Sequence, residues 1–123
     1  MKTYSDKTIL IAEDNEVSFF LLKETLEPIK INVIRADNGL EAVRLFKEED
    51  IDLVLMDIRM PYLNGMEALE EIRKISAEVP VYAQTAQVFP EEHSKYKDSG
   101  FNGVISKPID LEMILEILEK ELG

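Results

Sequence analysis

Four short apolar segments of the chain are each followed by residues that can bind a metal ion or a phosphoryl group. These residues are Glu13 and Asp14 after ILIA, Asp57 after DLVLM, Thr85 after VYAQ, and Lys107 after GVIS. Carboxylate oxygens are the ligands that hard divalent cations prefer, and an ammonium group binds phosphoryl oxygens. If the four segments are neighbouring strands, the side chains hold a divalent cation beside an aspartate that accepts phosphate.

Asp57 is the most demanding of these residues, because it directly follows the apolar run Leu53–Met56. A carboxylate at the end of a buried strand needs a partner. Neighbouring acids add repulsion of roughly 4 kcal/mol per pair at about 4 Å and an effective dielectric near 20. A bound cation relieves this repulsion. With oxygen ligands only, Mg²⁺ or the similar Mn²⁺ is the expected ion.

Each candidate also has a purely structural interpretation. Asp14 or Asn15 can cap a helix, and acidic residues are favoured at a helix N-terminus. Thr85 can be an ordinary strand residue, and Lys107 a solvated surface lysine. Their shared position at strand ends favours the site: Lys107 would pair with the acids, and the Thr85 hydroxyl would bond a phosphoryl oxygen.

The apolar pattern alternates between strand-like and helix-like segments. Short apolar runs, typical of strands covered on both faces, lie at Thr8–Ala12, Val33–Ile34, Leu53–Met56, Val79–Ala83 and Val104–Ile105. Helical spacing predicts helices over Glu16–Leu26, Gly39–Phe46, Gly65–Ile75, Pro90–Asp98 and Leu111–Leu122, the last capped by Asp110. Five strands alternating with five helices predict an α/β parallel sheet covered on both faces. Ligands of such sheets bind outside the carboxyl ends of the strands.

The bulk composition fits one acidic domain. The chain has 123 residues, of which 46% are hydrophobic, and a net charge of −11, which disfavours direct binding of nucleic acid. No apolar stretch is long enough to cross a bilayer and no signal region begins the chain, so we expect no membrane contact by this domain. The absence of cysteine fits a reducing cytoplasm. Residues 1–7 are expected to form a tail or linker remnant before a domain over 8–123.

Together these segments resemble the receiver domain of response regulators, the phosphoacceptor module of two-component signalling. The resemblance is carried by ILIAEDN, DLVLMDIRMPYLNG, VYAQTA and GVISKPI, and it covers nearly the whole chain. It implies a flavodoxin-like, doubly wound five-stranded parallel sheet in the order 2-1-3-4-5 with five helices.

The resemblance also implies a reaction. Asp57 would accept a phosphoryl group from phosphohistidine on a partner, with Mg²⁺ bound directly by Asp14, Asp57 and the backbone carbonyl of Arg59. Glu13 would act through water, and Thr85 and Lys107 would bind the phosphoryl group. The receiver would promote its own aspartyl phosphorylation and dephosphorylation. Movement of Thr85 would then shift the fourth helix and the fifth strand.

Three further positions bear on that reaction. Receivers often have an aromatic residue three before the lysine, as a partner for the Thr side chain. Here that position is Val104, so we expect a switch that is smaller or that runs through other contacts. Arg59 and Gln87 stand where the family tunes dephosphorylation. The single histidine, His93, lies in a polar segment and is assigned no catalysis.

Asn15, the QTA segment and ISKPI most resemble receivers of hybrid sensor histidine kinases and phosphorelays. The parent would then be a hybrid kinase, with a membrane anchor elsewhere, and the chain ends after the fifth helix without a DNA-binding output domain. A stand-alone regulator and a non-phosphorylated pseudo-receiver are the alternatives. A histidine kinase or histidine-phosphotransfer domain is expected to dock near Asn15, Ser18, Phe19 and Leu22, with Val17 and Leu21 filling the core by spacing.

Two other classes share parts of this pattern. Haloacid-dehalogenase-like phosphatases place a second Asp two residues after the nucleophile, where this chain has Arg59. A flavin-binding electron carrier needs a hydroxyl-rich phosphate loop after the first strand, where Glu13 and Asp14 would repel phosphate.

Overall fold

Strands and helices alternate along the chain, as the apolar pattern predicts. The computed structural model describes residues 2–86 and 90–123. The strands are β1 (Thr8–Ala12), β2 (Asn32–Ala36), β3 (Leu53–Asp57), β4 (Val81–Thr85) and β5 (Gly103–Ser106). The helices are α1 (Glu16–Leu26), α2 (Gly39–Glu48), α3 (Gly65–Ile75), α4 (Pro90–Asp98) and α5 (Leu111–Leu122), with a short 3-10 helix, η1 (Glu27–Ile29), after α1.

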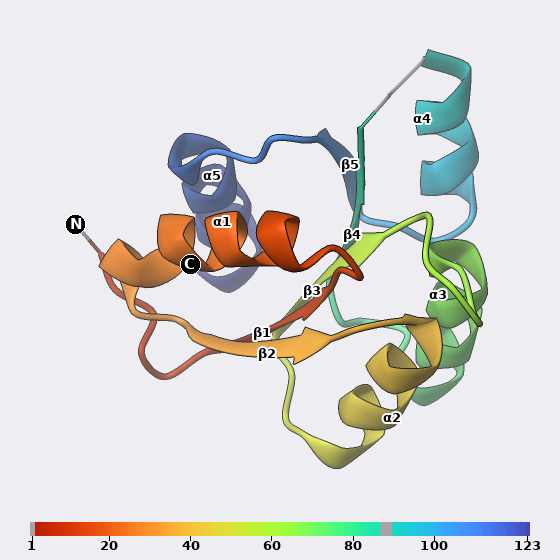
Figure 1. Ribbon diagram of the computed structural model, residues 1–123, viewed down its shortest axis with the longest axis horizontal. Coiled ribbons are helices and arrows are strands. Elements are labelled where there is room, and N and C mark those ends of the chain that lie inside the picture. Colours follow the sequence, from red (N-terminus) through yellow and green to blue (C-terminus); the bar gives the residue numbers. More distant parts are fainter. Residues whose placement is uncertain (1, 87–89) are drawn as a thin grey trace.

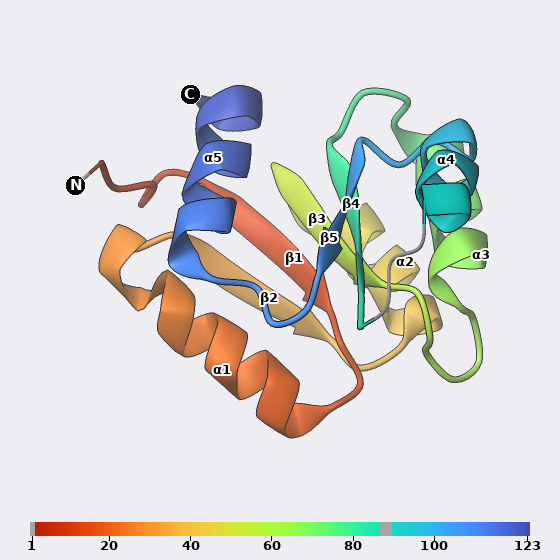
Figure 2. The same cartoon turned by 90° about the horizontal axis from the view of Figure 1, so that it is seen from above.

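The five strands form one parallel sheet in the order β2-β1-β3-β4-β5, which confirms the predicted topology. Helices α1 and α5 cover one face, and α2, α3 and α4 cover the other (Figures 1 and 2). Ala12 pairs with Met56, Asp57 with Gln84, and Thr85 with Ser106. The carboxyl ends of β1, β3, β4 and β5 therefore meet at one edge of the sheet.

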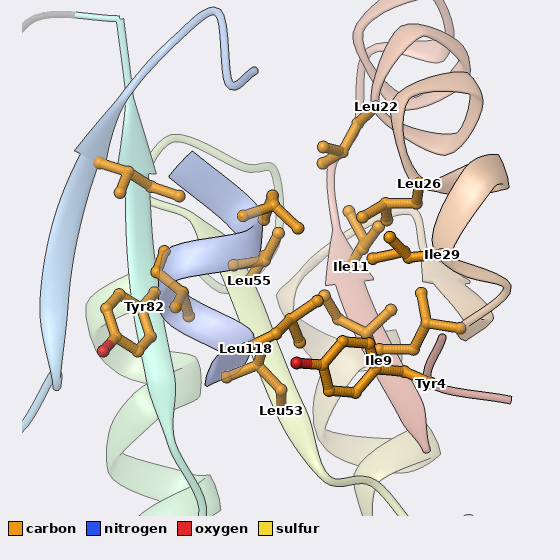
Figure 3. Packing of buried hydrophobic residues seen from close by; sticks show 14 residues of the cluster. Tyr4, Ile9, Ile11, Leu22, Leu26, Ile29, Leu53, Leu55, Tyr82 and Leu118 are labelled. Atoms are coloured by element: carbon orange, nitrogen blue, oxygen red, sulfur yellow. The ribbon is translucent and has the colours of Figure 1, made fainter. Parts of the chain in front are cut away.

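The core has one layer on each face of the sheet. All five residues of β3 are buried, as expected of a central strand with helices on both sides. The layer under α1 and α5 contains Ile9, Ile11, Leu53, Leu55 and Leu118 (Figure 3). The opposite layer, under α2 and α3, contains Leu10, Val54, Met56, Leu69 and Ile72. These two layers hold the strand ends, and so the polar residues that follow them, in fixed positions.

Polar caps fix where the helices begin. The side chains of Asn15, Asn38, Asn64 and Asp110 each accept a hydrogen bond from the backbone N–H three residues on. The cap predicted at Asp110 is thus confirmed. Because Asn15 caps α1, the neighbouring Asp14 is not needed for capping, and that alternative interpretation of Asp14 is wrong.

The segment before β1 is not a free tail over its described residues. Tyr4 is only 3% exposed, and its ring packs in the core layer under α1 and α5 (Figure 3). Its backbone N–H donates to the carbonyl of Ile29 at 2.7 Å. The expectation of a tail over 1–7 is therefore wrong at Tyr4. Its two neighbours on each side are polar, so the sequence gives no apolar pattern that would indicate burial.

The fourth strand lies two residues further along than the apolar run Val79–Ala83 predicts. Pro80 has no N–H to donate to the ladder, and the carbonyl of Val79 instead accepts from Arg73 Nη1 at 2.7 Å. The strand therefore begins at Val81 and extends to Thr85.

The faces of α1 also differ from the expectation. Leu22 and Leu26 are buried, whereas Val17 and Leu21 are 67% and 59% exposed. The assignment of Val17 and Leu21 to the core is therefore wrong, and Leu22, expected on the docking face, belongs to the core layer. Across the described residues, no helix is long and apolar enough to cross a membrane.

Candidate functional site

Three carboxylates meet at the carboxyl edge of the sheet. Glu13 and Asp14 follow β1, and Asp57 is the last residue of β3. One oxygen from each lies within 4.8 Å of the others. Glu13 is 2% and Asp57 8% exposed, while Asp14 is open to solvent. The cluster thus has two buried acids at its base and one acid at its rim.

Lys107 reaches this cluster from the end of β5. Its Nζ donates to Glu13 Oε1 at 2.5 Å and to Asp57 Oδ2 at 3.0 Å. Its backbone N–H donates to the carbonyl of Thr85 at 2.9 Å, which places Thr85 beside it at the same edge. The peptide bond from Lys107 to Pro108 is cis. The structure thus brings Glu13, Asp57 and Lys107 into direct contact.

Burial and pairing shift the pKa values at this site. Burial disfavours the charged form of Glu13 and raises its pKa; Lys107 opposes this rise, and the nearby Asp57 adds to it. For Lys107, burial alone would lower the pKa, but its bonds to Glu13 and Asp57 outweigh burial and raise it. Lys107 therefore stays charged, and the carboxylates of Glu13 and Asp57 share its ammonium group.

The loop after β3 holds Asp57 from its other side. The N–H of Arg59 donates to Asp57 Oδ1 at 3.3 Å, so both oxygens of Asp57 accept a hydrogen bond. Gly65 packs directly against this strand end. A Cβ atom there would lie 2.5 Å from the carbonyl oxygen of Asp57, so only glycine allows α3 to start so close.

Three contacts around the acids were not predicted from the sequence. The N–H of Asn15 donates to Glu13 Oε2 at 3.2 Å. The guanidinium of Arg35, in β2, donates to the backbone carbonyl of Glu13. Gln84 is 1% exposed, and its Nε2 lies 3.5 Å from the carbonyl of Ala12. The amide of Gln84 in the otherwise apolar VYAQ run was the one signal in the sequence for these contacts. The contacts of Asn15 and Arg35 involve backbone groups, which every residue carries.

The remaining predicted positions lie around this cluster. Thr85 is half-buried at the end of β4, and Val104 is half-buried in β5, where it packs against the layer under α2 and α3. Arg59 is exposed, and its backbone N–H contacts Asp57. Gln87 and the side chain of His93 lie outside the described part of the chain.

The donor set suits a hard divalent cation. All three acidic side chains offer oxygen, two are shielded from water, and an exposed acid at the rim leaves a route for a hydrated ion. Lys107 already balances part of the buried charge, which keeps the acids together. A phosphoryl group on Asp57 would meet the same ammonium.

The sequence matches the model of the response regulator receiver domain over residues 9–119. The chain belongs to this family. It is similar to the polar-differentiation response regulator DivK of Brucella ovis, at 35% identity over 95% of this chain and 97% of that protein. This receiver therefore belongs to two-component signalling. The alternative interpretations of the chain as a phosphatase or as a flavin carrier are not supported.

Two solved structures are informative neighbours of the receiver. One is the receiver domain of the sensor histidine kinase PA1611 from Pseudomonas aeruginosa, with a magnesium ion in its active-site cleft. It has a TM-score of 0.85 and 30% identity, over 94% of this chain and 96% of that one. The other is the complex of the Saccharomyces cerevisiae histidine phosphotransfer protein Ypd1 with the receiver domain of Ssk1. Its TM-score is 0.85 and its identity 30%, over 94% of this chain and 88% of that one.

A groove runs from the site along α1. It has a volume of about 640 Å³, and its lining includes Glu13 and Lys107 at one end and Leu21, Leu22 and Ile109 along its length. Phe20, 58% exposed, adds to the apolar surface of α1. The receiver thus presents apolar side chains next to its acidic cluster.

Proposed function

We propose that this receiver accepts a phosphoryl group on Asp57 from a phosphohistidine, in a reaction that requires Mg²⁺. The observation that carries the proposal is the double contact of Lys107 Nζ, 2.5 Å from Glu13 and 3.0 Å from Asp57. In the transfer, a carboxylate oxygen of Asp57 forms a bond to phosphorus. The phosphorus–nitrogen bond breaks, and the imidazole leaves with the electron pair.

Asp14 and Asp57 would hold the ion directly, with the backbone carbonyl of Arg59, and Glu13 would hold it through water; Mn²⁺ is an acceptable substitute. When bound, the ion neutralises charge on the transferring phosphoryl group. The neighbouring receiver of PA1611, with magnesium in its cleft, supports this ion. The buried pair of Glu13 and Asp57 supplies the charge that would attract it.

Lys107 and Thr85 would bind the phosphoryl oxygens. Lys107 then exchanges one of its carboxylate partners for the phosphoryl group, a charge-assisted bond that gives the ammonium a role in positioning. Thr85 lies at the adjacent strand end, its carbonyl 2.9 Å from the amide of Lys107. The added charge would shift the populations of α4 and β5. With Val104 in place of an aromatic residue, this shift would be smaller or would proceed through other contacts.

The same site would promote loss of the phosphoryl group to water. In that sense the receiver catalyses both its own phosphorylation and its own dephosphorylation. Arg59, and Gln87 outside the described residues, are the positions proposed to tune the lifetime.

We further propose that the phosphohistidine partner, a histidine kinase or a histidine-phosphotransfer domain, docks on α1. We expected contacts near Asn15, Ser18, Phe19 and Leu22. Because Val17, Phe20 and Leu21 are exposed, we place the centre of the docking surface on their face of α1, next to the face that we expected. The complex of Ypd1 with the Ssk1 receiver supports a partner of this kind.

A matched pair of variants tests the docking surface. Phe20→Ser should slow transfer from a phosphorylated phosphotransfer domain at least tenfold and leave phosphorylation by acetyl phosphate unchanged. Leu40→Ser is the control, because Leu40 is equally exposed, at 57%, but lies on α2 across the sheet. Equal transfer rates in both variants would refute docking on α1.

The parent protein is proposed to be a cytoplasmic or membrane-anchored hybrid sensor kinase, with this domain on its cytoplasmic side. The PA1611 receiver, from a sensor histidine kinase, supports this parent. DivK, matched over 97% of its length, supports the alternative of a stand-alone response regulator. Immunoblotting of the native protein distinguishes them, since a stand-alone regulator would migrate near 14.1 kDa.

The proposed reaction is tested by incubating the receiver with acetyl phosphate, with and without Mg²⁺. The expected result is a mass gain of one phosphoryl group that requires Mg²⁺ and is lost in Asp57→Asn. No Mg²⁺-dependent change with acetyl phosphate or beryllofluoride would favour a pseudo-receiver that acts only as an interaction module.

A further inference from the structure

Arg35 connects strand β2 to the backbone that carries two of the acids. Its Nε and Nη2 donate to the carbonyl oxygen of Glu13 at 3.3 and 3.2 Å. Nη2 also lies 3.5 Å from the carbonyl oxygen of Asp14. The planar guanidinium thus spans two successive peptide groups whose residues supply two of the three acids of the cluster.

Arg35 is itself held on two sides. Its guanidinium carbon lies 5.0 Å from the centre of the Phe19 ring in α1. Its Nε lies 3.4 Å from Asp37 Oδ1, and its side chain is only 25% exposed. A guanidinium with a stacking surface and fixed acceptors loses little further freedom when it binds the loop. These contacts make Arg35 a rigid connection between β2, α1 and the loop after β1.

We propose that Arg35 is a positioning residue for the divalent-cation site. This inference rests on the proposed function, because it concerns the same ion. By holding the carbonyls of Glu13 and Asp14, Arg35 fixes the orientation of their peptide planes, and therefore the directions in which both side chains leave the backbone. The N–H of Glu13 is held from the same side, by the carbonyl of Ala36 in β2 at 3.0 Å.

Charge and position predict opposite effects of removing Arg35. A positive charge beside the backbone of Glu13 and Asp14 repels a cation bound by their side chains, so its loss by charge alone would strengthen Mg²⁺ binding. Loss of the hydrogen bonds would instead release the loop and weaken binding. Groups that orient metal ligands typically change metal affinity 10- to 100-fold when they are removed. The sign of the change therefore separates positioning from electrostatics.

The test is calorimetric titration of the whole chain with Mg²⁺. Arg35→Gln should weaken binding by about tenfold. Arg35→Lys keeps the charge but lacks the planar fork, so it should also bind more weakly than the unmodified receiver. Arg44→Gln is the control, because Arg44 is exposed on α2 and pairs only with Glu48 among the described residues, at 2.8 Å; its affinity should stay within twofold.

Equal or tighter Mg²⁺ binding by folded Arg35→Gln overturns the inference. So does Arg35→Lys binding as tightly as the unmodified receiver, since charge would then suffice. Thermal unfolding checks that each variant is folded. If Arg35→Gln does not fold, Phe19→Leu decides the matter, because it removes the ring stacked on Arg35 and keeps an apolar side chain against the core layer. A loss of affinity of about two- to threefold supports the inference, and an unchanged affinity overturns it. Failure of the unmodified receiver to bind Mg²⁺ would instead refute the proposed function.

Discussion

At the scale of single residues, the site depends on one lysine that serves two buried acids. Residue type and position were enough to select Glu13, Asp14, Asp57 and Lys107, because charged side chains directly after apolar strands are unusual. Arg35 could not be selected in that way. An arginine at a strand end is usually a surface charge, and its acceptors here are backbone carbonyls, which every residue carries.

Replacement of Lys107 tests the role of the ammonium. Lys107→Ala should leave Mg²⁺-dependent phosphorylation detectable but slow it about a hundredfold, because one preorganised donor to the phosphoryl group is lost. The conformational response to beryllofluoride, followed by NMR shifts of α4 and β5, should be smaller. Lys120→Ala, an exposed lysine on α5, is the control. An unaltered response in Lys107→Ala would contradict the assigned role.

At the scale of elements, the sequence located nearly all strands and helices, but it did not decide which face of α1 is buried. Apolar side chains point to all sides of α1, so apolar spacing alone does not select the buried face. These side chains are Val17, Phe19, Phe20, Leu21 and Leu22. Contact with the sheet decides in favour of Leu22 and Leu26. The predicted start of β4 was two residues too early, because the sequence does not show that Arg73 binds the carbonyl of Val79.

The contact between β4 and α5 predicts an alkaline transition. The Tyr82 hydroxyl donates to Glu121 Oε2 at 2.6 Å. Burial and this carboxylate raise the pKa of Tyr82 above its ordinary value of 10.0, and the pKa of Lys107 is raised above 10.5. Both groups bind their proton more tightly when folded, so the stability they contribute is complete below pH 10 and is lost as the pH rises through their folded pKa values.

Urea unfolding between pH 9 and 12 measures this effect. The free energy of unfolding should fall with pH above about 10, and more steeply in the unmodified receiver than in Tyr82→Phe, which has no phenol to ionise. Parallel slopes for the two proteins would show that Tyr82 does not contribute.

At the scale of the whole molecule, the parallel sheet brings the carboxyl ends of four strands together at one edge. Alternation of strands and helices predicted a parallel sheet, whereas the order 2-1-3-4-5 came from the family resemblance and is confirmed. The packing of Tyr4 against the core could not be predicted, since a single aromatic residue in a polar segment carries no periodic signal. The groove beside α1 is likewise a property of the packed molecule.

Because the acids repel one another, a bound cation should stabilise the whole domain. At a Mg²⁺ concentration 100 times the dissociation constant, the free energy of unfolding should rise by about 2.7 kcal/mol, and a chelator should reverse the gain. Asp14→Asn should largely abolish it, whereas Asp50→Asn, an exposed acid after α2, should not. Equal Mg²⁺ stabilisation of both variants would place the ion elsewhere.

The most direct test of the central claim is to map the phosphorylated residue. The receiver is phosphorylated in Mg²⁺, the acyl phosphate is reduced with borohydride, and the digested protein is sequenced by mass spectrometry. Reduction converts a phosphorylated aspartate into homoserine, which we predict at position 57 alone. Homoserine at position 14, or a reduced glutamate at position 13, would contradict the assignment of Asp57 as the phosphoryl acceptor.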